Sequence, residues 1–222
     1  NDMSRQMMNP VRCLAIAALG CMTSLLPLAA DASAEQEWRF RVYLDDREIG
    51  HHHFKLTRDG MEERLATQAN FDVTFLKIPL FSYRHDNVER WSDKCLEEIS
   101  SNTDQNGKQY RVEGLATGEG FHVQTNSGEQ TLPACISTFA YWDKSFLKQN
   151  RLLNSQTGEY LDVEVDYLGE KPLAMQATEV RAHHYRLTAN KLDIEVWYSL
   201  DDRWLALQST TDSGRLLRYV VE

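Results

Sequence analysis

The stretch 65-LATQANFDVTF-75 decides the fold class, because the character of its side chains alternates at every second position. Successive side chains of a β-strand point to opposite faces, so this period is typical of a half-buried strand, whereas an amphipathic helix repeats at three and four. Phe71, Val73 and Phe75 all fall on one face. We therefore expect a long strand with a strongly aromatic inner face.

The same alternation continues along most of the chain. Trp38, Phe40, Val42 and Leu44 share one face of an earlier segment, and turn sequences such as that at 104–107 separate the later ones. No low-complexity linker divides residues 35–222, which are predicted to form one all-β domain, either a strongly curled antiparallel sheet or a barrel. Strands are expected over 38–44, 49–57, 65–75, 80–92, 94–103, 108–117, 121–132, 161–167, 178–188, 191–199, 204–211 and 215–221.

One segment departs from this alternation. Between residues 137 and 149, Phe139, Trp142, Phe146 and Leu147 recur at spacings of three and four. This spacing predicts one short helix near 137–149, laid across a barrel mouth or a sheet face.

The first 34 residues have the pattern of a secretory signal peptide. Arg5 and Arg12 precede an apolar stretch over 13–30, and small residues follow at 32–34. An uncleaved membrane anchor and a lipid modification at Cys21 are the alternatives. We expect residues 1–34 to be removed, which leaves a periplasmic or secreted product that begins near Glu35.

The charge balance limits the class of partner. The chain has 24 Lys and Arg against 33 Asp and Glu, a formal charge of −9. This acidic balance argues against nucleic acid or anionic lipid headgroups as the main partner, and membrane contact is expected only through the signal peptide before cleavage. With 42% hydrophobic residues and 5 Pro, the chain is neither disordered nor collagen-like.

Two cysteines, Cys95 and Cys135, remain in the predicted mature chain. An even pair in an oxidising compartment predicts one disulfide, worth about 4 kcal/mol for a loop of this length. A redox pair and two metal ligands are the competing interpretations, but both usually require the closer C-x-x-C spacing.

Motifs for catalysis are missing from the sequence. It has no G-x-S-x-G elbow, no H-E-x-x-H pair and no glycine-rich phosphate loop. We therefore predict no catalytic residue and no cofactor, and the sequence favours a non-enzymatic protein. Serine hydrolases without such local motifs stay an open alternative.

Three consecutive histidines lie in the second expected strand. His51 and His53 share one face, so both imidazoles could bind one metal ion. His183 or His184 could supply a third ligand if the strands pair. The alternative is that these imidazoles lie on a solvated sheet face.

Aromatic residues provide the strongest indication of a ligand. The chain has 5 Trp, 9 Tyr and 8 Phe, which could line a hollow or fill a packed core, and the sequence leaves both open. The segment 139–142, with its aromatic run, could act as a lid. The candidate ligand-binding residues are Trp38, Phe40, Phe71, Phe75, Phe121, Phe139, Tyr141 and Trp142.

Several short stretches resemble an uncharacterised family of exported bacterial all-β proteins, a domain of unknown function. The resemblance spans nearly the whole predicted mature chain and implies export and a β fold. The family is distantly similar to periplasmic curled-sheet proteins, some of which carry lipids, and this analogy supplies no catalytic residue. The stretches are Trp38–Asp45 with Glu48–Gly50, Phe139–Trp142, Leu152–Asn154, Thr157–Gly158, Val196–Tyr198 and Arg218–Tyr219.

Three functions follow from these patterns. The first is non-enzymatic binding of an apolar or lipid-like molecule in an aromatic-lined hollow. The second is a metal-binding protein or metal-dependent enzyme built on His51 and His53. The third is a cell-envelope module that docks another protein.

Overall fold

The computed structural model describes residues 33–76, 78–176 and 178–222. The signal peptide predicted for residues 1–34 lies outside the described residues, apart from Ser33 and Ala34. The elements in the described part are β1 (Ala34–Leu44), β2 (Arg47–Asp59), β3 (Glu62–Phe75), β4 (Ile78–Ser92), β5 (Cys95–Gln105), β6 (Lys108–Thr117), β7 (Gly120–Thr125), β8 (Gly128–Leu132), η1 (Lys144–Lys148), β9 (Arg151–Leu153), β10 (Tyr160–Asp162), β11 (Glu164–Met175), β12 (Thr178–Ala189), β13 (Leu192–Ser199), β14 (Trp204–Thr210) and β15 (Leu216–Val221).

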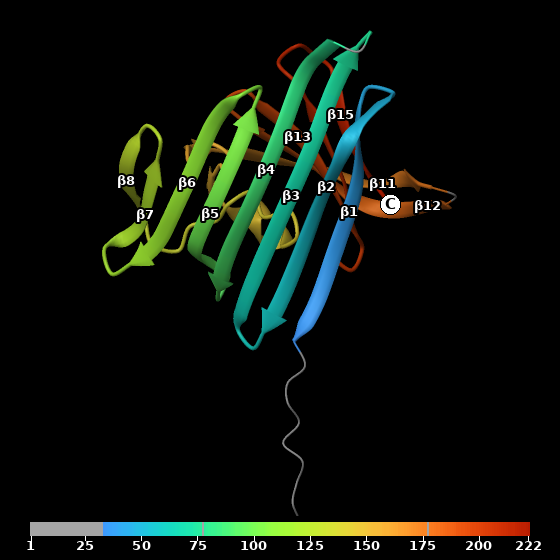
Figure 1. Cartoon of the computed structure of the whole chain (residues 1–222). Helices are drawn as coiled ribbons and strands as arrows, with labels where there is room; N and C mark the ends of the chain where they lie inside the picture. Colours follow the sequence, from blue (N-terminus) through green and yellow to red (C-terminus); the bar gives the residue numbers. More distant parts are fainter. Residues whose placement is uncertain (1–32, 77, 177) are drawn as a thin grey trace, which may run out of the picture. The chain divides into compact units, whose positions relative to one another are not determined.

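Thirteen of these strands form one sheet, in the order β11-β12-β13-β14-β15-β1-β2-β3-β4-β5-β6-β7-β8, while β9 and β10 pair separately. Two antiparallel meanders are joined where β1 pairs with β15, with Phe40 opposite Val221. Figure 1 shows β1–β7 in front and the strands of the second meander behind them. Within the described residues β8 and β11 end the sheet, so the sheet is curled but open. The predicted all-β fold with a curled antiparallel sheet is confirmed.

The two meanders face each other through aromatic side chains. Phe40 on β1 is fully buried and lies 4.7 Å from Trp204 on β14, measured between ring centroids. Phe54 on β2 approaches the same Trp204 edge-on at 5.0 Å, and Trp38 approaches it at 5.9 Å. Large rings supply much buried apolar area, so these contacts hold the two layers together.

The chain between β8 and β11, which we call the inner segment (residues 133–163), lies on the concave side of the sheet. Its Leu152 and Leu153 have no accessible surface and pack in the main hydrophobic cluster. The hydroxyl of Tyr198 on β13 donates a hydrogen bond of 2.7 Å to the carbonyl of Tyr141 in this segment. The inner segment therefore fills much of the space that the curled sheet surrounds.

The predicted helix is shorter than expected and is a 3₁₀ helix. It covers Lys144–Lys148, with the side chain of Asp143 accepting a hydrogen bond from the Ser145 amide at its start. The residues before it form other main-chain hydrogen bonds instead. For example, the amide of Leu153 donates a hydrogen bond to the carbonyl of Ser137. Tertiary contacts thus outweigh the helical spacing over the first half of the expected range.

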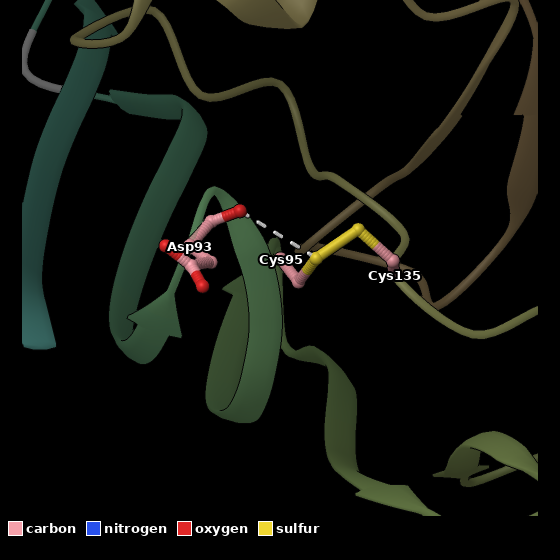
Figure 2. Close-up of a disulfide and its surroundings, with 3 residues drawn as sticks. All are labelled: Asp93, Cys95 and Cys135. Carbon is pink, nitrogen blue, oxygen red and sulfur yellow. Dashed lines mark hydrogen bonds between the residues drawn. A yellow bond between two sulfur atoms is a disulfide. The ribbon is translucent and has the colours of Figure 1, made fainter. Parts of the chain in front are cut away.

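The predicted disulfide between Cys95 and Cys135 is present, with their Cα atoms 4.5 Å apart. Figure 2 shows it joining the start of β5 to the inner segment, with Cys95 Sγ 3.7 Å from the carbonyl oxygen of Asp93. The neighbouring Leu96 amide also donates a hydrogen bond to the carbonyl of Ile136. These bonds fix the point at which the inner segment enters the curl.

No helix in the described ranges has both the length and the apolar character needed to cross a membrane.

Candidate functional site

A groove of about 800 Å³ lies where the inner segment meets the ends of several strands. Its walls come from the β2–β3 hairpin, the β4–β5 turn, η1 and the residues before it, β11, β12 and the β13–β14 turn. The lining residues are Arg58, Glu63, Lys94, Trp142, Asp143, Lys144, Ser145, Leu147, Lys148, Val165, Tyr167, Tyr185 and Asp202.

One side of the groove is apolar and aromatic. Trp142 is buried against Trp91, with the rings edge-to-face at 5.6 Å, and Leu147, further along the inner segment, is half-buried. Tyr167 and Tyr185 stand across from each other on β11 and β12, with ring centroids 4.9 Å apart. These surfaces can take an alkyl chain or a ring without losing a hydrogen bond.

The indole nitrogen of Trp142 gives the groove a further polar feature. It is buried and has no hydrogen-bond partner among the described residues. A buried donor without a partner costs roughly 1–3 kcal/mol. An acceptor oxygen on a bound molecule would remove this cost.

Basic side chains also line the groove. Lys144 Nζ binds Asp202 and lies 5.4 Å from the ring centre of Tyr185. Burial works to lower the pKa of Lys144, but the hydrogen bonds to Asp202 and Tyr185 outweigh it, so the pKa is raised and the ammonium stays charged. Lys94 lies 3.8 Å from Asp143, at the outer range of an ion pair.

Lys148 differs from these paired groups. The side chain is exposed at the end of η1, and no carboxylate in the described part of the chain lies within ion-pair distance of it. Four basic and three acidic side chains line the groove, so it is locally positive on a chain whose formal charge is −9. A negatively charged group is therefore repelled less here than the formal charge of the whole chain implies.

The structure separates most of the predicted ligand-binding residues. Trp38 and Phe40 pack on Trp204. Phe71, near the C-terminal end of β3, stacks on Tyr83 in a second, separate cluster. Phe121 is buried, Phe139 and Tyr141 are half-buried in the inner segment, and Phe75 belongs to β3. Of the eight, Trp142 lines the groove.

The histidine pair lies on β2, with His53 Nε2 3.4 Å from Glu37 and His51 exposed. The strand β2 pairs with β1 and β3, whereas His183 and His184 lie on β12 between β11 and β13. The pairing that would add a third histidine is therefore not formed. The described residues contain no group of three or more His, Cys, Asp or Glu that could hold a metal ion.

A second feature is not evident from the sequence pattern: polar residues lie on the concave face of β2–β5. We call it the polar patch, and on it Thr67 pairs with Asn87 and Asn87 with Ser101 in adjacent strands. One polar atom of each is buried without a hydrogen-bond partner in the described part of the structure. The members of the polar patch are His52, Thr67, His85, Asn87, Ser101 and Thr103.

The histidines of the polar patch are uncharged at neutral pH. Desolvation lowers the pKa of His85 to about 4, and its Nδ1 lies 2.8 Å from the hydroxyl of Thr103. Burial also holds the pKa of His52 well below its ordinary value, and its Nδ1 lies 3.2 Å from the hydroxyl of Tyr219. The patch is thus polar but without charge.

Glu89 ties the inner segment to the sheet beside this patch. Its carboxylate accepts hydrogen bonds from Asn87, from the indole of Trp91 and from the hydroxyl of Thr138 in the inner segment. Desolvation raises the pKa of Glu89, although the three hydrogen bonds act in the opposite direction. At the far end of the segment, Gln156 accepts a hydrogen bond from Tyr83 and donates one to Gln105.

The curled open sheet, filled by an internal segment, defines a barrel-like all-β protein. Residues 40–222 match a protein-family model described as a domain of unknown function, DUF6134, and the chain belongs to this family. The chain is also similar to a solved structure from Brucella abortus, described as a beta-barrel-like protein of domain of unknown function DUF1849. Their TM-score is 0.62 at 7% identity, over 84% of this chain and 94% of that one, which shows a shared fold. Comparison with curated proteins gave no match.

Proposed function

We propose that this protein is an exported, non-enzymatic binding protein whose groove takes a lipid-like molecule with an acidic head group. The groove carries the proposal, because it combines an aromatic wall with a locally positive rim. Both features are needed for an amphipathic anion, which must lose water from its apolar part and keep a counter-charge at its head.

The apolar part of the ligand would lie against Trp142, Leu147 and Tyr185. These side chains come from the inner segment and from β12, so a bound hydrocarbon chain would contact both the inner segment and the sheet. Burying a hydrocarbon chain there contributes about 0.8 kcal/mol per methylene group.

The head group would lie between Lys94 and Lys148. Both ammonium groups project from exposed side chains at the rim, and neither is fully engaged by a carboxylate in the described structure.

Export is the second part of this proposal. The disulfide between Cys95 and Cys135 supports it, because such bonds persist in oxidising compartments. The first strand begins at Ala34, next to the expected start of the mature chain. Sequencing of the N-terminus after fractionation should find the protein in the periplasm or medium, starting near Glu35, and a cytosolic full-length chain would contradict export.

The ligand proposal is tested by native mass spectrometry of protein purified from the periplasm, followed by titration with dodecyl phosphate. The double variant Lys94→Glu/Lys148→Glu should bind this probe at least about tenfold more weakly, since charge-assisted contacts are worth roughly 1.5–3 kcal/mol. Lys108→Glu/Lys191→Glu, which makes the same charge change outside the groove, should bind like the wild type.

Two results would contradict the proposal. One is wild-type protein that is always empty and fails to bind dodecyl phosphate. The other is equal loss of binding in both double variants, which would assign the effect to net charge and not to the groove.

A further inference from the structure

The hairpin that joins β3 to β4 extends beyond the strands on both of its sides. Pairing of β3 with β2 stops at Phe71, and pairing of β4 with β5 begins at Tyr83. The strands β3 and β4 continue to pair with each other from Asp72 opposite Ser82 to Phe75 opposite Ile78, beyond the residues that pair with β2 and β5. In Figure 1 this end of β3 and β4 rises past the neighbouring strands.

The two faces of this ribbon differ in burial. Val73 is buried on the inner face, where Phe81 packs on the cluster formed with Phe71. Beyond this cluster, toward the tip of the hairpin, aliphatic side chains are exposed to water: Leu76 is 81% exposed, and Ile78 and Leu80 are each 61% exposed. Several exposed aliphatic side chains close together favour a contact surface.

A partner strand would not suit this ribbon. Pro79 has no amide hydrogen to offer, which interrupts strand addition along the β4 edge. Three side chains also present far less than the roughly 800 Å² per partner that a stable protein interface buries. These properties disfavour both a second copy and a folded partner.

A basic side chain lies close to the apolar tip. Arg47 donates a hydrogen bond of 3.1 Å to the hydroxyl of Thr74, close to the turn. Aliphatic side chains beside an Arg suit the boundary between acyl chains and head groups.

We propose that the tip of the β3–β4 hairpin, with Leu76, Ile78 and Leu80, inserts into the surface of a lipid bilayer and holds the protein there reversibly. This contact of the mature domain goes beyond the sequence-based expectation, which limits membrane contact to the signal peptide. The proposal does not depend on the ligand groove. Arg58 and Glu63 of the groove lie at the opposite end of β3, roughly 40 Å along the strand from the tip. A protein docked by the tip would therefore keep its groove away from the membrane plane.

The test is flotation of purified full-length mature protein with phosphatidylcholine vesicles, repeated with vesicles that also contain phosphatidylglycerol. Wild-type protein should float with both. Leu76→Ser/Leu80→Ser should reduce the vesicle-bound fraction at least about tenfold, because two aliphatic anchors are lost. The control Leu115→Ser/Leu200→Ser replaces two leucines that are 50% and 55% exposed elsewhere and should float like the wild type.

Thermal unfolding and size-exclusion chromatography complete the test. All four leucines are exposed, so both double variants should unfold at the wild-type temperature. The proposal is overturned if the wild type fails to float, or if the tip variant floats as well as the control. It is also overturned if the wild type is a dimer that the tip variant converts to a monomer. Loss of flotation with intact binding of dodecyl phosphate would support the membrane contact separately from the groove.

Discussion

The concave face of the sheet has two halves that are stabilised differently. Around β1 and β14 the face is aromatic, and Phe40 packs directly on Trp204 from the opposite meander. Across β2–β5 it carries the polar patch, and the inner segment covers the interior there. In the aromatic half, contacts between the two meanders join the sheet, and Tyr141 of the inner segment also stacks on Trp204. In the polar half, the disulfide and Glu89 hold the inner segment against the sheet.

The largest loss of stability is expected in the aromatic half. Phe40→Ala should lower the free energy of unfolding by up to about 5 kcal/mol, because it leaves a cavity at a fully buried ring. Urea unfolding measures this change. Phe81→Ala, at a half-buried ring of the projecting hairpin, should cost less. Equal losses of free energy of unfolding at both positions would show that the aromatic half contributes no more to stability than the projecting hairpin.

Removal of the disulfide should have the next largest effect. Cys95→Ser/Cys135→Ser is expected to lower the free energy of unfolding by about 4 kcal/mol, because the unfolded chain gains the freedom of a loop with a sequence separation of 40. Wild-type protein treated with an alkylating reagent under denaturing conditions should show no free thiol. A double variant as stable as the wild type would mean that the disulfide does not hold the inner segment.

The polar half should also be sensitive to acid. His85 is 5% exposed, and its folded pKa of about 4 lies below the ordinary value of 6.5. The unfolded chain therefore binds the extra proton first, and stability present above pH 6.5 is lost as the pH falls toward 4, by about 3 kcal/mol.

Unfolding curves between pH 7 and pH 4 test this dependence. His85→Gln should flatten the dependence, whereas His122→Gln, at an exposed histidine of β7, should leave it unchanged. The contribution of His85 is the difference between wild type and His85→Gln in the pH dependence of the free energy of unfolding. If this difference is zero between pH 7 and pH 4, His85 is not held in its neutral form.

The smallest effect has the opposite sign. Ser101 has no accessible surface, and its hydroxyl lacks a hydrogen-bond partner in the described structure, so Ser101→Ala should raise stability by about 1 kcal/mol. Thr103→Val should lower it by a similar amount, since it takes the partner from His85. Calorimetry on the pair compares them directly. A loss at Ser101 would indicate that an ordered water or a ligand uses that hydroxyl.

Much of the fold follows from local pattern. The alternation around Phe71 and Phe40 predicts strands because period two is a property of the backbone, and the cysteine pair predicts the disulfide because so few alternatives remain in the mature chain. The helix at 137–149 is overestimated since the hydrogen bond between Leu153 and Ser137 competes with helical bonding.

The candidate site could not be found in this way. The groove joins Arg58, Lys94 and Lys144, which are far apart in sequence and meet through the register of the sheet and the path of the inner segment. Asn87 and Ser101 are polar residues on the inward face, so their polarity alone predicts exposure to solvent. Residue type indicates burial only on average. The inner segment, which covers these positions, is distant from them in the sequence.

Hydrogen exchange in wild type and in Cys95→Ser/Cys135→Ser tests most directly whether the inner segment holds the polar half. Without the disulfide, exchange should accelerate over residues 133–163 and at the amides of β4 and β5, while β1, β14 and β15 keep their wild-type protection. Uniform acceleration over all strands, or none in the inner segment, would contradict this division of the molecule.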